Sequence, residues 1–206
     1  MKARFFLPIA VSVLFAICTV SVHSQTVITF DDLSDSTSGT FIANGYQGLN
    51  WTNFFHLNAI FHSKDTVVSG YNYGMVSASN VAFNGRGNPA EIDSQSSNFN
   101  FLCAYLTGAW NSNLNIEVEG FSATTLLYDT TVVASATSPT LYAFNYLDID
   151  RLTFNSFSGQ NAGFGEFGEQ FAMDNFTFEF VPEPSTLLLA GFGTLTLWPL
   201  LKRRRA

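Results

Sequence analysis

The stretch NFNFLCAYL, residues 98–106, alternates its side chains in the way that a half-buried β-strand requires. Successive side chains of an extended chain point to opposite faces of a sheet. The spacing therefore predicts one shared face for four side chains: Phe99, Phe101, Cys103 and Tyr105. On that face Cys103 is expected to be a buried, unreactive thiol. The next run, LNIEVEGF at 114–121, repeats the pattern and predicts a second such strand.

Five more runs outside this centre show the same alternation: TVITFDD, TLLYDTTVV, TLYAFNYLDI, RLTFNSF and FAMDNFTFEF. Polar turn clusters such as SDSTSG, GRGNP and SGQNAGFG separate them, and no long segment has a helical period. Many short strands joined by polar turns are typical of two packed sheets. The sequence predicts an all-β, jelly-roll-like β-sandwich over residues 25–180.

Composition and charge restrict what this domain can bind. The 206-residue chain is 47% hydrophobic and has 22 Phe, which excludes a disordered protein. Residues 25–180 contain three cations and fifteen carboxylates, hence a net charge of −12. A domain of that charge repels nucleic acid, so we expect no nucleic-acid partner.

The first 24 residues have the form of a secretory signal peptide. A basic start is followed by an apolar run from Phe5 to Val20, and Val22-His23-Ser24 places smaller residues where a signal peptidase reads. We expect cleavage after Ser24 and export of the remainder across the inner membrane.

The C-terminal end predicts a single transmembrane helix. Residues 187–201 carry no charge, and as a helix they would span about 22 Å against a bilayer core of about 30 Å. Pro199 weakens this short span further. The cations after it favour a cytoplasmic end by the positive-inside tendency: Lys202, Arg203, Arg204 and Arg205.

A proline-flanked glutamate precedes this helix. The motif residues are Val181, Pro182, Glu183, Pro184 and Ser185. Followed by a short apolar helix and an arginine cluster, they resemble a PEP-CTERM sorting signal. The resemblance implies recognition and processing by exosortase, a membrane enzyme of Gram-negative bacteria that make exopolysaccharide. The prolines keep the backbone extended and accessible at the membrane surface.

The chain thus divides into a signal peptide (1–24), a β-sandwich ectodomain (25–180) and a sorting tail (181–206). The ectodomain is loosely similar to those found ahead of many PEP-CTERM tails. We expect a cell-envelope, cell-surface or matrix protein with a structural or adhesive role and no enzymatic activity. The alternative is a carbohydrate-binding module for extracellular polysaccharide, and a glycan hydrolase is a third hypothesis.

Three carboxylates suggest a structural calcium ion. Asp32 is in phase with Phe30, and Asp174 is in phase with Phe176, so each would end a core-facing row. Calcium takes six to eight oxygen ligands and could join Asp31, Asp32 and Asp174 across the first and last strands. The alternative is that these residues belong to solvated turns and strand ends.

Other groups have ordinary structural interpretations. Glu117 and Glu119 are spaced like the carboxylate pair of a glycosidase, but also like the solvent face of a strand. His56 and His62 are weak zinc candidates. The GFGEFG segment at 163–168 is expected to be a loop rather than a nucleotide site.

Four aromatic side chains are candidates for stacking on sugar rings: Trp51, Trp110, Tyr71 and Tyr73. Trp110 follows the buried row of the central strand and is expected in the core. The sequence leaves Trp51 open between core and surface.

Overall fold

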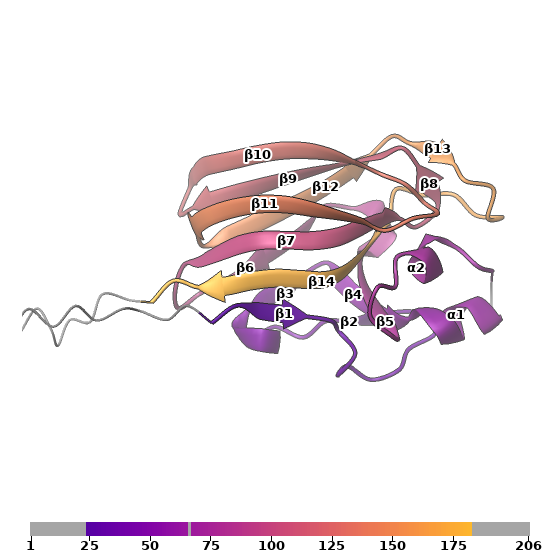
Figure 1. The fold of residues 1–206 in the computed structure, drawn as a ribbon, viewed down its shortest axis with the longest axis horizontal. Helices are drawn as coiled ribbons and strands as arrows, with labels where there is room; N and C mark the ends of the chain where they lie inside the picture. The colour runs from indigo at the N-terminus through magenta and orange to yellow at the C-terminus, as the bar shows by residue number, and fades with distance from the viewer. Residues whose placement is uncertain (1–23, 66, 183–206) are drawn as a thin grey trace, which may run out of the picture.

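The computed structural model describes residues 24–65 and 67–182, and within them the chain forms two packed antiparallel sheets (Figure 1). The predicted all-β sandwich is therefore confirmed. Most of the predicted signal peptide lies outside the described residues, and so does the tail from Glu183 onward with its predicted helix and the terminal cations. Within the described residues no helix has the length and apolar character needed to cross a membrane.

The larger sheet has seven strands in the order β11-β7-β14-β5-β4-β2, with β1 also paired to β14. Its strands are β1 (Thr26–Ile28), β2 (Thr40–Phe41), β4 (Phe54–Asn58), β5 (Asn80–Asn84), β7 (Phe99–Gly108), β11 (Thr140–Ile149) and β14 (Phe171–Phe180). The last described strand, β14, is thus central, since it pairs with β7 on one side and with β5 and β1 on the other.

The smaller sheet has five strands in the order β10-β9-β12-β6-β3. These are β3 (Asn50–Thr52), β6 (Ala90–Asp93), β9 (Leu114–Ser122), β10 (Thr125–Ala134) and β12 (Arg151–Phe157). A two-stranded sheet pairs β8 (Asn111–Ser112) with β13 (Gln160–Asn161).

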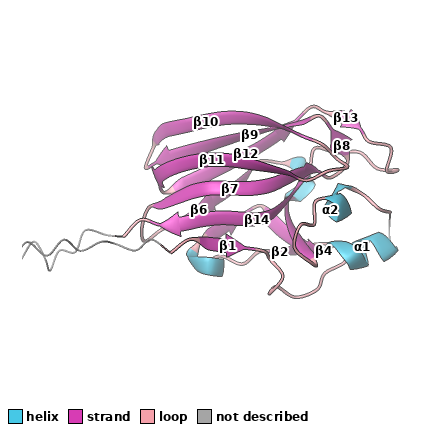
Figure 2. Cartoon of the chain, in the orientation of Figure 1, coloured by secondary structure: helices cyan, strands magenta, loops and turns pink. Residues whose placement is uncertain are grey.

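Short helices connect the strands. They are the α-helices α1 (Ala59–Asp65) and α2 (Gly70–Tyr73) and the 3-10 turns η1 (Tyr46–Gly48) and η2 (Gly85–Gly87). The alternation pattern did not predict α1 or α2. Figure 2 shows both of them away from the end of the sandwich where β14 finishes.

The core between the sheets is built largely from phenylalanine. Phe54 packs edge-on against Phe154, and Phe101 stacks on Phe176 with ring centroids 4.8 Å apart. Trp51 is also in this core, 4% exposed, and its Nε1 donates a hydrogen bond to the Tyr46 carbonyl. The alternating runs account for this core because each contributes one apolar face.

An irregularity in the pairing of β7 with β14 shifts the predicted faces. In β7 the core residues are Phe99 and Phe101, and then Ala104 and Leu106, so the alternation changes phase between them. Cys103 is consequently half-buried outside the core, and its prediction as a buried core thiol is wrong. The pairing of β7 with β14 changes register at this point, as expected for a β-bulge.

The same irregularity moves Asp174. The core residues of β14 are Phe171 and Met173 on one side of the bulge and Phe176 and Phe178 on the other. Between them Asn175 has φ 50°, and the pairing with β7 shifts register between Asp174 and Thr177. Asp174 is therefore out of phase with the core row that contains Phe176.

Candidate functional site

A second apolar cluster lies apart from the sandwich core and joins α2 to strands of the larger sheet. Its buried members are Leu57, Ala59, Tyr71, Val81, Phe83, Ala109, Trp110 and Ala172. Helix α2 can approach β7 closely because residue 70 is glycine: a Cβ there would lie 1.8 Å from the Gly108 carbonyl oxygen. This contact places Tyr71 against Trp110, with ring centroids 5.6 Å apart.

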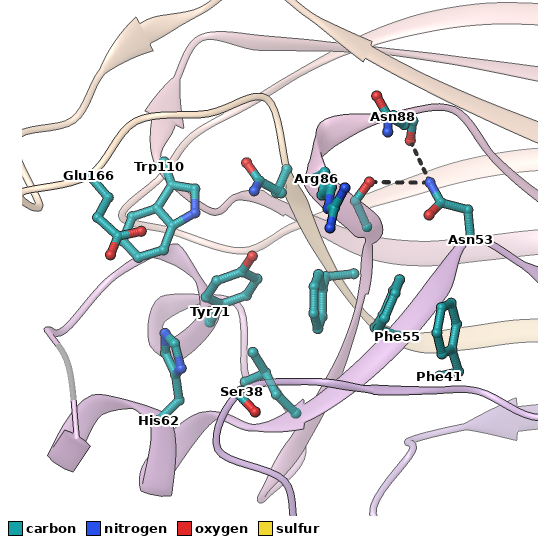
Figure 3. A pocket seen from close by; sticks show the side chains of 14 residues that line it. Ser38, Phe41, Asn53, Phe55, His62, Tyr71, Arg86, Asn88, Trp110 and Glu166 are labelled. Atoms are coloured by element: carbon teal, nitrogen blue, oxygen red, sulfur yellow. Dashed lines mark hydrogen bonds between the residues drawn. The ribbon is translucent and has the colours of Figure 1, made fainter.

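A pocket of about 610 Å³ opens beside this cluster. The residues lining it are Ser38, Phe41, Asn53, Phe55, Leu57, His62, Tyr71, Phe83, Gly85, Arg86, Asn88, Trp110, Glu166 and Gln170. Figure 3 shows aromatic rings following one another along it, from Trp110 and Tyr71 to Phe55 and Phe41. Aromatic lining with a few polar groups is typical of a small-ligand site.

Successive rings of this row are in contact. Centroid separations are 5.2 Å for Tyr71 and Phe83, 5.5 Å for Phe83 and Phe55, and 4.0 Å for Phe55 and Phe41. Exposure rises along the row, from 4% at Tyr71 to 66% at Phe41. We call these five residues, Trp110, Tyr71, Phe83, Phe55 and Phe41, the aromatic row. Its Trp110 end is buried, and its Phe41 end is exposed to solvent.

Polar side chains form the rim of the pocket. The Asn53 amide donates to the carbonyls of Gly85, Asn88 and Pro89 at 3.2, 3.2 and 3.0 Å. These bonds fix the turn that carries Arg86. At the other end Glu166 comes from the glycine-rich loop, and Figure 3 shows it beside Trp110. GFGEFG is thus a loop before β14, as predicted.

Burial changes the titration of two groups near the pocket. It raises the pKa of the Tyr71 phenol well above its ordinary value of 10.0, so Tyr71 stays protonated. It also lowers the pKa of His56, which is 2% exposed, below its ordinary value of 6.5. Both side chains are therefore uncharged at neutral pH.

The structure gives the three calcium candidates separate hydrogen-bonding roles. Asp174, fully buried, accepts hydrogen bonds from the backbone N–H groups of Val76 and Ser77 at 2.7 and 2.8 Å and from the Ser77 hydroxyl at 3.0 Å. Asp31 accepts from the Asn80 N–H, and Asp32 is an exposed turn residue bonded to the Tyr46 hydroxyl.

These carboxylates do not form a common cation site. Across residues 24–65 and 67–182 no three or more His, Cys, Asp or Glu side chains gather in a way that could hold a metal ion. Asp31 and Asp174 instead hold the segment between α2 and β5 from its two ends.

The surroundings of Glu117 and Glu119 differ from those of a glycosidase carboxylate pair, and those of the histidines differ from a zinc site. Glu119 accepts a hydrogen bond from Thr153, and Glu117 accepts one from Asn155, both across the β9–β12 pair. Neither lines the pocket. His62 does line it, and its Nδ1 lies 2.7 Å from the Thr37 carbonyl oxygen.

Two members of the aromatic row, Trp110 and Tyr71, were candidates from the sequence. Trp110 is buried as expected, but in the second cluster, and Tyr71 belongs to the row, whereas Trp51 is a core residue and no surface platform. The sequence did not point to four other residues that line the pocket: Phe41, Phe55, Phe83 and Arg86. The paired phenylalanines in NFFH, Phe54 and Phe55, could have pointed to Phe55. Adjacent residues of a strand face opposite sides of the sheet, so one of the two rings must lie away from the sandwich core.

A scan against protein families matches residues 180–205 to the PEP-CTERM protein-sorting motif. The protein carries a PEP-CTERM sorting motif. The motif implies processing by exosortase, a membrane enzyme, and hence export and sorting to the cell envelope or surface. Of its predicted residues, Val181 and Pro182 are described, and the Val181 N–H donates to the Asn98 carbonyl at 2.8 Å.

No curated protein matches this chain. Among solved structures, it is similar to a DUF4465 family protein from Bacteroides ovatus, at 11% identity and TM-score 0.43 over 78% of this chain and 95% of that one. It is also similar to TmCBM61 in complex with β-1,4-galactotriose, at 8% identity and TM-score 0.36 over 68% and 94%. A third is the tailspike protein 4 enzymatically active domain of bacteriophage CBA120, at 9% identity and TM-score 0.32 over 67% and 20%.

Proposed function

We propose that this PEP-CTERM protein is an adhesive component of the extracellular polysaccharide matrix, and that its ectodomain binds glycan through the aromatic row. The sorting motif supplies the destination, and the pocket supplies the binding site. This combines the structural or adhesive role with the carbohydrate-binding alternative.

The observation that supports this proposal is the open end of the aromatic row. Phe41 is 66% exposed and packs on Phe55 within a pocket whose rim carries amide, guanidinium and carboxylate groups. Sugar rings have apolar faces that pack on aromatic rings and peripheral hydroxyls that need polar partners. The pocket offers both at its open end, where the exposed Phe41 ring packs on Phe55.

Binding without catalysis is part of the proposal. The two carboxylates with glycosidase spacing, Glu117 and Glu119, are each hydrogen-bonded to a neighbouring strand and lie outside the pocket lining. A glycosidase needs one such group to act as an acid and the other as a base or nucleophile beside the substrate.

The test is retention of the full-length protein on the producing strain's own exopolysaccharide. Phe41→Ala should weaken binding about tenfold, because an exposed stacking surface is lost with little change in the core. Phe167→Ala is the matched control, since Phe167 is an exposed phenylalanine, 82% accessible, that does not line the pocket.

Equal retention of wild type, Phe41→Ala and Phe167→Ala would contradict binding through the aromatic row. The same incubations measure reducing ends released from the polysaccharide. Release that depends on Glu119, judged with Glu119→Gln, would contradict the non-enzymatic role.

A further inference from the structure

Arg86 is a pocket-lining cation in a strongly acidic domain. Residues 25–180 carry only three cations. Arg151 pairs with Glu91 at 3.3 Å and packs over Phe121, and Lys64 lies over the Phe61 ring. Arg86 has no carboxylate partner among the residues that the structure describes, and it lines the pocket. A cation kept unpaired in such a domain is available to an anionic ligand.

The turn that presents Arg86 is fixed before any ligand arrives. Arg86 has φ 59°, a conformation that L-residues adopt at a cost. The turn is held by the Asn53 amide and by the Gly85 N–H, which donates to the Asn53 carbonyl at 3.0 Å. Gly85 lets it pack against the aromatic row, since a Cβ there would lie 2.4 Å from the Phe55 ring. Such preorganisation lowers the entropy cost of binding.

We propose that the pocket is selective for an acidic sugar, a uronate unit, whose carboxylate pairs with Arg86 while its ring packs on the aromatic row. This inference rests on the proposed function and specifies its substrate class. The guanidinium fork matches a carboxylate in two parallel hydrogen bonds. A uronate carries its carboxylate on the ring periphery, where it can reach a cation at the pocket rim.

Glu166 limits where the carboxylate of the ligand can lie in the pocket. Figure 3 shows it at the Trp110 end of the pocket, whereas Arg86 lies beside Asn53 and Asn88. A carboxylate at the Trp110 end would meet like charge, so that end suits a neutral sugar whose hydroxyls donate to Glu166. The proposed uronate unit therefore lies on the Arg86 side of the pocket rather than beside Glu166.

The experiment titrates full-length protein, purified in detergent, with galacturonate, glucuronate and mannuronate oligosaccharides. Each probe is paired with its methyl ester, which keeps the ring and removes the charge. We expect at least one free acid to bind about tenfold more tightly than its ester, as charge-assisted hydrogen bonds imply. Arg86→Gln should remove this preference, Arg86→Lys should keep part of it, and Arg151→Gln should leave it unchanged.

A second readout needs no variant. The preference of wild type for acid over ester should fall as salt is raised, because an exposed ion pair is screened. Equal affinity for acid and ester, with both still dependent on Phe41, would overturn the uronate inference and leave the proposed function standing. A preference insensitive to both Arg86→Gln and salt would also overturn it. Absence of binding to every probe and to the native exopolysaccharide would overturn both.

Discussion

Asp174 shows how a buried carboxylate can be held by backbone groups. Burial raises its pKa above the ordinary value of 3.8, although the hydrogen bonds from Ser77, Val76 and Asn175 oppose this effect. The folded protein therefore binds the Asp174 proton more tightly than the unfolded chain does. A bound calcium ion would instead lower the pKa of the carboxylate, because a cation favours the charged form.

Substituting Asp174→Asn separates these two cases. The amide accepts on one atom only, so at neutral pH we expect a loss of about 1–3 kcal/mol in the free energy of unfolding. As pH falls towards 3.8, protonation stabilises wild type relative to the unfolded chain, so the difference between wild type and variant should grow. Denaturant titrations at neutral and acidic pH, each with and without a chelator, measure this. A difference that shrinks on acidification, or that disappears with chelator, would restore the calcium hypothesis.

At the scale of elements, the pocket depends on how closely α2 lies on β7. Besides the Gly108 oxygen, a Cβ on residue 70 would lie 2.8 Å from the Ala109 Cα, and both obstacles are backbone atoms. The Gly70 N–H also donates to the Ala109 carbonyl at 2.8 Å. Any larger residue must therefore move the helix and with it Tyr71.

Gly70→Ala should lower the free energy of unfolding by about 1–3 kcal/mol or more, as overpacking does, and should weaken glycan retention through Tyr71. Gly163→Ala is the control: its Cβ meets nothing within 4 Å, but its φ of +85° costs about 1 kcal/mol. Thermal melts and the retention assay measure the two effects. If Gly70→Ala were as stable as the control and bound normally, the close packing of α2 would not position the row.

Alternation along the chain was sufficient to predict most strands and the sandwich, because each strand buries one face. It failed where β7 and β14 share a bulge, since one extra residue moves every later side chain to the other face. Cys103 and Asp174 were misplaced for that reason. The pocket was mostly missed because its parts meet only through packing: Phe41 on β2, Arg86 in a turn and Trp110 after β7 carry no common spacing.

The pocket and the sorting motif lie at opposite ends of β14. Gln170, just before the strand, lines the pocket, and the motif starts at Phe180, where the strand ends. Ten residues of strand extend over about 33 Å. Residue 26 pairs with residue 178, so the described chain begins beside the end of β14 (Figure 1). The end of β14 that leads into the motif is thus separate from the end that borders the pocket.

This separation predicts that sorting and binding can be lost independently. Phe41→Ala should be exported and processed like wild type, with the same C-terminus after Phe180 and an intact mass that differs from wild type only by the Phe-to-Ala substitution, because the strand that leads to the motif is unaffected. Glu183→Ala should keep full retention on polysaccharide in vitro while accumulating with its tail, since the proline-flanked glutamate belongs to the motif alone. Mass spectrometry of envelope and medium fractions, combined with the retention assay on the same samples, measures both properties. If Phe41→Ala lost binding and also had a different C-terminus, the two ends would be coupled through β14, and the glycan would have to act on the protein before exosortase does. If Glu183→Ala lost retention, the two ends would likewise be coupled through β14.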